Sequence, residues 1–502
     1  MTIDYDVVII GGSLAGRYAA LAATKLYAKV ALVEPQINYG FIYHQTFSEI
    51  ANILKSFKDA AGFGIHTSHT DIAEKCHVSV AWQEAMQYAY GVAENIHEIN
   101  SPATLAALGV DVIVGRGEFQ SKPNLAFAVY DNDSKSSDSQ SNFSSQTNIL
   151  RLLRGRTYLL ASGSSPTIPN IDGLQATGYL TLNNIWQYLT QPTIPQNWVI
   201  IGGIPQSIEI AQTLARLGCT VTLVVKYPYI LPNIDPEIAQ LLQAQLEVDG
   251  VRVLAQTLTT QVRQIDDKKW IQAGDKAIET DEILVATGQT PNFASLNLAA
   301  VGVKWYKHRL VVNNKLQTTN KRIYACGDVI GGYEFANIAN YEARIALNNA
   351  LFFPRLNVNY QHIPWGIFTH PMLARVGLTE EQANKFYHHK VIVLRQYFKS
   401  LTSAQIQSET TGICKLIVLR NGDIIGATIL GATTAELINL IAFAMVQKIK
   451  VKDLANLAPV YPSFSEILVQ TAQTWHQQRL KSNSNLQDRL EGFFHVRRNW
   501  NL

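Results

Sequence analysis

Cysteine is scarce in this sequence, and the four residues lie far apart. No cysteine precedes Cys76, and the other three are Cys219, Cys326 and Cys414. None of them forms a C-x-x-C or C-x4-C pair, and no group of them has the spacing of a zinc site. The sequence therefore predicts buried thiols in a reducing compartment, and no metal site.

Charged residues and long apolar runs are also few. Only 16% of the 502 residues are charged and the formal net charge is +3, so composition indicates neither nucleic acid nor an acidic partner. No window of about 18 uninterrupted apolar residues occurs, and the N-terminus lacks the pattern of a signal peptide. We therefore expect a cytoplasmic protein that does not cross a membrane, with about three domains.

Residues 5–34 have the pattern of a dinucleotide-binding unit. An apolar run of strand length, residues 5–10, leads into the turn Gly11-Gly12-Ser13-Leu14-Ala15-Gly16 and a Leu/Ala-rich segment to residue 26. A second apolar run, residues 29–33, follows and is succeeded by Glu34. The backbone amides of the turn and of the following helix attract a pyrophosphate, and a carboxylate at Glu34 can accept both hydroxyls of a ribose. Ser13 takes the place of the usual second glycine, and its small side chain should still fit.

The same order of strand, turn, helix and strand recurs between residues 198 and 226. Its turn is Gly202-Gly203-Ile204-Pro205-Gln206-Ser207, in which Ile204 and Ser207 replace glycines. A branched side chain at Ile204 should obstruct a dinucleotide unless the turn is reshaped. Lys226, where an acidic residue is usual, favours the 2′-phosphate of NADPH. Two copies of the strand, turn, helix and strand unit predict two nucleotide-binding sites.

The remaining segments are of three kinds. Apolar residues at spacings of three and four predict helices over residues 47–57, 81–92 and 336–351, and an α+β domain with strands at 415–418 and 423–430 and a helix at 435–448 follows residue 356. Residues 131–148 are rich in Ser, Asp and Asn and predict a flexible hairpin tip.

The C-terminal tail has Leu486, Leu490, Phe493 and Phe494 at helical spacing before Arg497-Arg498. This pattern suits packing of the tail on its own dimer or contact with a membrane surface.

Five motifs in order carry a resemblance to a known family. The first glycine turn is followed by Ala161-Ser162-Gly163, Ala286-Thr287-Gly288, Ala325-Cys326-Gly327-Asp328 and, near the end, Phe368-Thr369-His370-Pro371 with Val376-Gly377-Leu378-Thr379-Glu380. Residues 4–475 resemble the pyridine nucleotide-disulfide oxidoreductases, which include dihydrolipoamide dehydrogenase, glutathione reductase and mercuric reductase. The resemblance implies an α/β fold with two Rossmann-like nucleotide-binding domains, for FAD and NAD(P), and a C-terminal α+β dimerisation domain that completes the active site of a homodimer.

The resemblance also implies domain boundaries and cofactor-binding residues. The FAD-binding domain would comprise residues 1–165 and 286–352, the NAD(P)-binding-like domain 166–285, the dimerisation domain 353–476 and a tail 477–502. Asp328 matches the aspartate that binds the ribityl chain, and Gly117, expected in a turn, matches a glycine beside the adenine. The residues implied for FAD are Gly11, Gly12, Ser13, Leu14, Ala15, Gly16, Glu34, Gly117, Ser162, Gly163, Gly327, Asp328 and Ala336, and those for NAD(P)H are Gly202 and Gly203.

The sequence departs from the family where the redox chemistry takes place. The family has two cysteines five positions apart after the acidic residue, and here Tyr39 and His44 have that spacing. Tyr461 replaces a histidine that acts as acid/base for the thiols and is oriented by the residue matching Glu466. Glu209 still matches a glutamate near the nicotinamide. Dithiol chemistry is thus excluded at this position, and the thiols and their base are missing together.

Three functions are compatible with these residues. The first is an oxidoreductase that passes electrons from NAD(P)H through FAD to a diffusible small-molecule acceptor such as a quinone or dye, with Tyr461, Glu466 and Glu209 as active-site residues. The second is a non-catalytic FAD-binding dimer, structural or redox-sensing, that has lost nicotinamide and thiol chemistry. The third, a thiol or mercuric reductase using Cys76 or Cys414, needs a cysteine that is not in the right turn.

Overall fold

The computed structural model describes residues 3–34, 40–65, 79–130, 149–191, 194–481 and 484–500. These form two compact units, Met1–Gly202 with Thr259–Val358 and Gly203–Leu258 with Asn359–Leu502, so the division falls inside the second glycine turn. Tyr39, Cys76 and the Ser-rich segment 131–148 lie outside the described residues. The side chains of Glu34 and Leu486 do as well.

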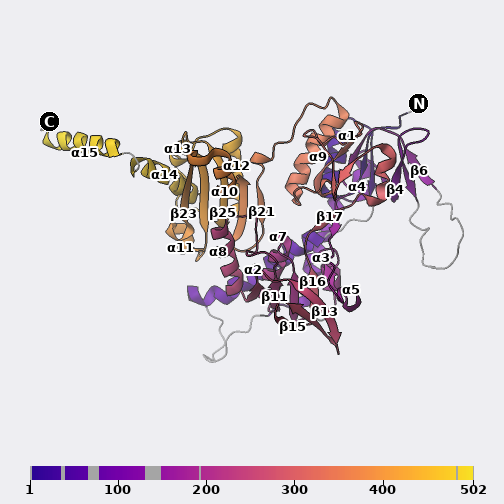
Figure 1. The fold of residues 1–502 in the computed structure, drawn as a ribbon, viewed down its shortest axis with the longest axis horizontal. Coiled ribbons are helices and arrows are strands. Elements are labelled where there is room, and N and C mark those ends of the chain that lie inside the picture. The colour runs from indigo at the N-terminus through magenta and orange to yellow at the C-terminus, as the bar shows by residue number, and fades with distance from the viewer. Residues whose placement is uncertain are drawn as a thin grey trace. The chain divides into compact units, whose positions relative to one another are not determined.

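The first unit is built around a five-stranded parallel sheet with the strand order β20-β7-β1-β2-β3. Figure 1 shows the helices and strands of both units. Its strands are β1 (Tyr5–Ile10), β2 (Val30–Glu34), β3 (Asp111–Val114), β7 (Gly155–Leu160) and β20 (Ile323–Ala325). Val7, Val8 and Ile9 are wholly buried, because helices cover parallel sheets on both faces and the strands are then apolar throughout. Strand β3 follows a helical segment over residues 102–107.

Two helices with alanine-rich faces pack together beside this sheet. They are α1 (Leu14–Lys25) and α9 (Ala336–Leu351). The small side chains of Ala15, Ala19, Ala343 and Ala346 are almost completely buried in one cluster with Val7. Small residues allow the helices to approach closely and thereby hold the glycine turn before α1 against the sheet.

The first unit contains further helices and smaller sheets. The α-helices are α2 (Gly40–Asp59), α3 (Trp82–Ile99), α4 (Pro102–Ala107), α5 (Leu174–Thr177) and α6 (Ile185–Tyr188), and the 3-10 helices are η1 (Ala60–Phe63), η3 (Ala294–Leu296), η4 (Leu298–Val301) and η5 (Gly327–Ile330). The antiparallel strands are β4 (Arg116–Gln120), β5 (Ala126–Tyr130) and β6 (Ile149–Leu153); β13 (Thr259–Ile265), β14 (Lys268–Ala273) and β15 (Lys276–Thr280); β8 (Ser164–Pro166) and β17 (Gln289–Pro291); and β18 (Trp305–Tyr306) and β19 (Arg309–Leu310). The strands β9 (Leu180–Thr181), β10 (Asn197–Ile201) and β16 (Glu282–Val285) pair in parallel.

The second unit combines the rest of the second strand and helix repeat with the C-terminal domain. The repeat supplies α7 (Pro205–Arg216), β11 (Thr220–Val224), α8 (Pro236–Val248) and β12 (Val251–Leu254). The C-terminal domain has an antiparallel sheet in the order β21-β22-β25-β24-β23. Its strands are β21 (Trp365–Ile367), β22 (Met372–Gly377), β23 (Val391–Tyr397), β24 (Ile413–Leu419) and β25 (Ile424–Gly431).

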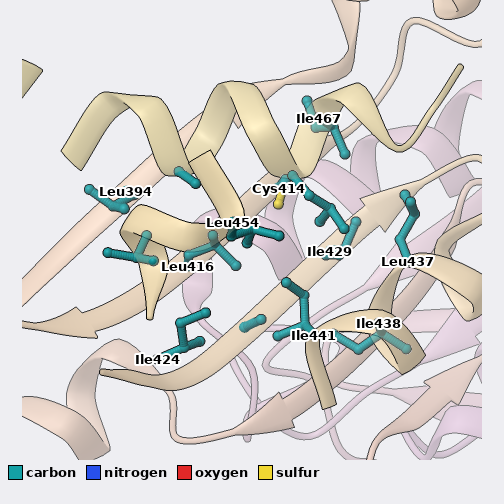
Figure 2. Packing of buried hydrophobic residues seen from close by; sticks show 14 of the residues in the cluster. Leu394, Cys414, Leu416, Ile424, Ile429, Leu437, Ile438, Ile441, Leu454 and Ile467 are labelled. Carbon is teal, nitrogen blue, oxygen red and sulfur yellow. The ribbon is translucent and has the colours of Figure 1, made fainter. Parts of the chain in front are cut away.

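Helices cover this antiparallel sheet and enclose its core (Figure 2). The helices along this part of the chain are η6 (Tyr360–His362), α10 (Glu380–Tyr387), η7 (His388–Lys390), η8 (Phe398–Ser400), α11 (Thr402–Ile406), α12 (Thr434–Val446), α13 (Val451–Ala455) and α14 (Glu466–Lys481). The exposed helix α15 (Ser484–Asn499) follows α14 and is not part of this core. Leu416 and Ile429 from the sheet meet Ile441 of α12 and Ile467 of α14, all of them wholly buried. The predicted α/β class with a C-terminal α+β domain is confirmed.

Candidate cofactor-binding site

Three of the predicted motifs meet at one edge of the parallel sheet. The ends of β1, β2 and β7 are level, since Ile10 is paired with Val33 and with Leu160. The segments that follow are tied across this edge by hydrogen bonds from Gly11 N to Val33 O at 2.8 Å and from Cys326 N to Leu160 O at 2.9 Å. The turns at residues 11–16, 161–163 and 327–328 therefore lie at the carboxyl ends of the strands, where α/β sheets bind ligands.

The first turn requires glycine at two positions for steric reasons. Gly11 has φ 116°, and a Cβ there would lie 2.3 Å from the carbonyl oxygen of Ala161. A Cβ at Gly16 would lie 2.0 Å from the carbonyl oxygen of Gly11. The two residues thus bring the turn against the neighbouring strand and against the first turn of α1.

Ser13 does not need to be glycine, because its backbone is extended with φ −61° and ψ 165°. Its Oγ accepts a hydrogen bond from Gly16 N at 3.3 Å and donates one to Ala161 O at 2.9 Å. Ser13 therefore caps α1 and joins the two turns. No acidic side chain lies in the first turn of α1, so the helix N-terminus remains suited to an anion such as a pyrophosphate.

Arg17 supports the same turn and was not predicted from the sequence. Its side chain is 2% exposed, its Nε donates to Gly12 O at 3.1 Å, and its Nη1 donates to the carbonyl of Asn100, the C-cap of α3. A buried guanidinium beside a pyrophosphate turn places positive charge close to the expected anion. The sequence signal that could have revealed it is an arginine on the buried face of an alanine-rich helix.

Asp328 provides an acceptor at the opposite side of this edge. Its carboxylate accepts a hydrogen bond from Ser164 Oγ at 3.0 Å, and burial raises the pKa of Asp328. The neighbouring Gly327 has φ 72° and donates its N–H to Glu342 Oε2 at 2.6 Å. A desolvated carboxyl group with few protein donors gains hydrogen bonds from the hydroxyls of a ribityl chain.

These residues fit FAD. The turn before α1 would hold the pyrophosphate and Asp328 the ribityl chain, and a Cβ at Gly163 would meet no protein atom within 4 Å, so there is open space beside that backbone. Ser162 Oγ donates to Asn292 O at 2.6 Å and fixes the second turn. Ala336 is the first residue of α9, Leu14 is exposed and Ala15 is buried.

Gly117 lies inside strand β4, not in the predicted turn. A Cβ at this position would be 2.3 Å from Ala128 O and 2.5 Å from a ring carbon of Phe127. Packing against β5 is thus sufficient to require glycine here, whether or not an adenine lies nearby.

Glu334 lies between η5 and α9, and burial, with the charge of Asp328, raises its pKa from 4.5 to about 7. Ionised Glu334 therefore costs folding free energy above pH 7, and this cost disappears as the pH falls towards 4.5. We expect Glu334→Gln to raise the free energy of unfolding at pH 8 by on the order of 1–2 kcal/mol and to leave it unchanged at pH 4.5. Chemical denaturation at both pH values measures this. The control Glu381→Gln removes a carboxylate that forms an exposed ion pair with Lys385, and its free energy of unfolding should not rise at pH 8. An equal change in the free energy of unfolding of the two variants would contradict the raised pKa of Glu334.

The second glycine turn is less suited to a dinucleotide. Ile204 is the N-cap of α7 and makes no side-chain capping bond, and Pro205 occupies the first helical position. Proline lacks an N–H, so this helix N-terminus offers one amide fewer to a phosphate. Ser207 is fully buried, and its Oγ donates to Ile204 O at 2.7 Å.

The residues after β11 also differ from an adenosine-binding pattern. Val225 is wholly buried, and a Cβ at Gly203 would lie 2.8 Å from its Cγ1. Lys226 is exposed, with its Nζ 4.9 Å from the ring centroid of Tyr227. Val225 therefore packs against the turn and only Lys226 is left to meet a ribose or its 2′-phosphate.

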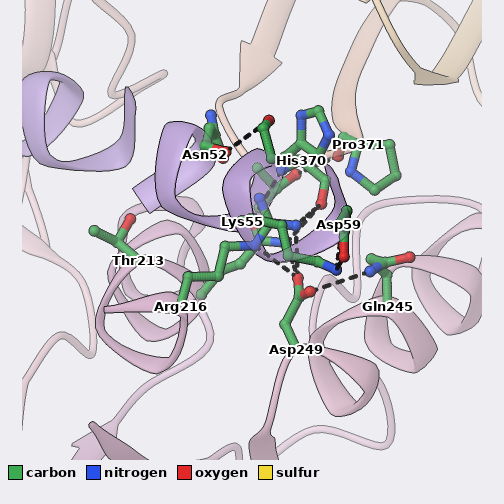
Figure 3. A network of polar contacts seen from close by, with 12 residues as sticks. Asn52, Lys55, Asp59, Thr213, Arg216, Gln245, Asp249, His370 and Pro371 are labelled. Carbon is green, nitrogen blue, oxygen red and sulfur yellow. Dashed lines mark hydrogen bonds and ion pairs between the residues drawn. The ribbon is translucent and has the colours of Figure 1, made fainter. Parts of the chain in front are cut away.

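One face of α7 holds the loop between β21 and β22 (Figure 3). Glu209 Oε1 accepts from Phe368 N at 2.7 Å, and Gln212 Oε1 accepts from His370 N at 2.8 Å. Arg216 pairs with Asp249 at 2.8 Å and donates to His370 O at 2.9 Å. Glu209, predicted near a nicotinamide, is thus 5% exposed and bound to a backbone amide in the second unit.

Tyr461 and Glu466 are near one another in sequence but make separate contacts. Tyr461 is 68% exposed, and its hydroxyl is 3.1 Å from Thr402 Oγ1. Glu466 Oε1 accepts from Ser463 N at 2.9 Å at the start of α14. Glu466 therefore fixes the loop that carries Tyr461, while the phenol is available at the surface of the single chain.

His44 lies in α2 and belongs to an aromatic cluster. Its ring is 5.7 Å from that of Trp186, and Phe47 is stacked between Trp186 at 5.1 Å and Trp82 at 4.9 Å. His44 is 4% exposed and Phe47 is fully buried. Aromatic packing thus joins α2, α3 and α6, and no thiol is needed for that contact.

The cysteines of the described residues are unsuited to nucleophilic chemistry. Cys219, Cys326 and Cys414 are not joined in disulfides and are at most 6% exposed. Burial raises the pKa of Cys414 to about 12 and that of Cys326 further. The thiols of Cys326 and Cys414 are therefore neutral at physiological pH, and all three thiols are shielded from substrates.

The C-terminal helix α15 exposes the apolar side chains of Phe493 and Phe494 beside Arg497 and Arg498, and the exposed Trp500 follows the helix. Among the described helices, none combines the length and the hydropathy that a bilayer crossing requires.

Comparison with known proteins identifies one family over nearly the whole chain. Residues 5–343 match the family described as pyridine nucleotide-disulphide oxidoreductase, and residues 363–472 match its dimerisation domain. A mercuric reductase of Staphylococcus aureus is 30% identical over 94% of this chain and 82% of its own length. A dihydrolipoyl dehydrogenase of Synechocystis sp. is 28% identical over 93% of this chain and 97% of its own.

Solved structures show the same fold. LpdA from Mycobacterium tuberculosis matches with a TM-score of 0.80 at 23% identity, over 93% of this chain and 99% of that one. The HOCl-induced flavoprotein disulfide reductase RclA from Escherichia coli matches with a TM-score of 0.77 at 24% identity, over the same shares of the two chains.

Proposed function

Because the chain belongs to the pyridine nucleotide-disulphide oxidoreductase family, we propose that it is an FAD-dependent oxidoreductase that passes electrons from NAD(P)H to a diffusible acceptor without a redox disulfide. The observation that carries this proposal is the combination of a first glycine turn and an Asp328 that fit FAD with the absence of any cysteine before Cys76. FAD supplies a two-electron store, so a protein dithiol is not required between donor and acceptor.

The residues of this chain would have distinct roles in that reaction. The turn before α1, together with Asp328, would hold the cofactor, and Arg17 would keep the turn in place. Tyr461 would donate a hydrogen bond to a quinone or dye, because the O–H of a phenol is a hydrogen-bond donor. Glu466 would position the segment that carries Tyr461. We propose that a homodimer brings this exposed tyrosine to the partner's cofactor, since the chain carries the dimerisation domain.

Thiol reagents should leave the activity intact. We expect the protein treated with iodoacetamide or arsenite to reduce menadione with NAD(P)H at its original rate, because no thiol lies on the electron path and the described cysteines are buried. A dihydrolipoamide dehydrogenase assayed on lipoamide serves as the positive control for inhibition. Inactivation of this protein by the same treatment would return a thiol to the mechanism.

Removing the Tyr461 hydroxyl should affect one half of the reaction only. We expect Tyr461→Phe to lower kcat/KM for menadione by about fivefold, which is the cost of one hydrogen bond, while the rate of flavin reduction by NAD(P)H stays the same. Stopped-flow absorbance resolves the two halves. The control Tyr397→Phe, at another exposed tyrosine, should change neither rate, and a loss in flavin reduction would place Tyr461 on the donor side.

A second function is favoured by the second glycine turn. Ile204, Pro205 and the buried Val225 together make it a poor dinucleotide site. The alternative is therefore a non-catalytic FAD-binding dimer that serves as a structural protein or redox sensor. Bound FAD with no turnover on any acceptor would support this alternative.

A further inference from the structure

A long stretch of the first unit contains basic residues and no acidic ones. Between Glu282 and Asp328 the 45 intervening residues include six Lys and Arg and no Asp or Glu. Removing these six from the 42 Lys and Arg of the chain leaves 36, against 39 Asp and Glu. The positive net charge of the protein is thus concentrated in this stretch, which the overall composition conceals.

The centre of the stretch is the hairpin of β18 and β19. Trp305 pairs with Leu310 and Tyr306 with Arg309, and Lys307 has φ 55° in the two-residue turn. Residues 304–309 are all exposed, with Trp305 at 45% and Tyr306 at 71%. The side chain of Lys307 lies over the ring of Tyr306, with its Nζ 5.5 Å from the centroid.

The basic groups of this hairpin form no ion pair with any of the described residues. None of the ion pairs among the described residues involves Lys304, Lys307 or Arg309. Lys304 N donates to Thr319 Oγ1 at 2.9 Å, which brings the turn with exposed Lys321 beside the hairpin. We call Lys304–Arg309 with Lys321 the basic hairpin surface.

The basic hairpin surface adjoins the cofactor-binding residues. The ring of Trp305 is 5.8 Å from that of Phe293, and the preceding Asn292 donates its N–H to Gly163 O at 2.9 Å. On the other side, Arg309 Cγ would lie 2.7 Å from a Cβ at Gly331, which directly follows η5. One contact thus connects the surface to the second turn of the FAD site, and one to the helix that contains Asp328.

We propose that the basic hairpin surface docks an acidic electron-carrier protein that accepts electrons from this enzyme. Unpaired Lys and Arg attract and orient an acidic partner, and exposed Trp and Tyr are the residues that interfaces favour at their centres. The proposal rests on the proposed function, which supplies the electrons. The balance is NAD(P)H + 2 oxidised carriers → NAD(P)+ + 2 reduced carriers + H+, with one electron for each carrier.

Binding tests this proposal without requiring turnover. FAD-loaded protein is titrated calorimetrically with a plant-type ferredoxin and with a flavodoxin, which are both acidic, and with cytochrome c, which is basic. We expect at least one acidic carrier to bind at about 20 mM salt, with affinity at least tenfold weaker at about 300 mM, and cytochrome c not to bind.

The variant Lys304→Gln/Lys307→Gln/Arg309→Gln should weaken that binding at least tenfold. The matched control Lys385→Gln/Lys390→Gln/Lys452→Gln removes the same charge from exposed positions in the second unit and should bind as the original does. Equal FAD content of the two variants shows that both are folded. Absence of binding to both acidic carriers, or binding that the first variant does not weaken, would overturn the proposal.

Other occupants are separate outcomes of the same experiment. Binding of oligo(dT) or of phosphatidylserine vesicles that depends on the three hairpin residues, without binding of either carrier, would also overturn it. Menadione turnover distinguishes failure of the docking proposal from failure of the proposed function. The hairpin variant should retain the original menadione rate, whereas absence of menadione turnover in every form of the protein counts against the proposed function.

Discussion

Gly16→Ala abolishes FAD retention. The added Cβ would lie 2.0 Å from the carbonyl oxygen of Gly11, which is far inside van der Waals contact, so the turn and the first turn of α1 must move apart. This displaces the amides that would bind the pyrophosphate. We expect the ratio of FAD to protein after purification to fall below about a tenth of its original value, because the displaced amides no longer converge on one phosphate site.

The matched control is Gly91→Ala, which adds the same methyl group to the middle of α3. A Cβ at Gly91 would meet no atom within 4 Å, and alanine favours a helix over glycine by about 1 kcal/mol. This variant should keep its FAD and unfold at the same or a higher temperature. Full FAD content in Gly16→Ala, measured by absorbance near 450 nm, would contradict the assignment of the first turn to the cofactor.

Ile204→Gly lowers KM for NADPH at least tenfold and leaves kcat nearly unchanged. The substitution restores the glycine that allows a dinucleotide backbone to approach the turn, and uniform binding energy of this kind changes KM and not kcat. Steady-state kinetics with menadione as acceptor measure both constants. In the control Ile204→Val the branched Cβ remains, so KM should stay close to the original.

The outcome separates the two functions proposed for the chain. If Ile204→Gly gains affinity, the second turn is a working but restricted nicotinamide site. If its KM equals that of the original protein, then Pro205 and the buried Val225, and not Ile204, limit binding at the second turn, or the dinucleotide binds elsewhere. No detectable turnover in either form favours the non-catalytic dimer.

The parallel sheet and its turns could be predicted because local sequence determines them. The apolar runs at residues 5–10 and 29–33, with glycine turns and an alanine-rich helix, match the observed β1, β2 and α1 within one or two residues. Periodicity likewise located α9 over Ala336–Leu351. These features depend on backbone geometry and on the period of buried positions, which a single sequence shows.

The contacts around the site could not be predicted, because they join residues far apart in the chain. Arg17 meets Asn100, Glu209 meets Phe368, and Ser164 meets Asp328 only after the fold has formed. Gly117 was assigned to a turn because glycine is typical of turns, but packing of β4 on β5 is what requires it. The basic hairpin surface could not be predicted from composition, because the net charge of +3 is a sum over all 502 residues and does not show a local excess of Lys and Arg.

Anaerobic titration of the FAD-loaded protein with NADPH, followed by flavin absorbance, tests the central claim most directly. Our account predicts complete bleaching at about one equivalent of NADPH for each flavin, because the flavin alone accepts two electrons. NADH should require a higher concentration, since Lys226 favours the 2′-phosphate. A flavin that stays oxidised would contradict the proposed enzyme, and consumption of about two equivalents would show a second redox pair and contradict electron transfer without thiols.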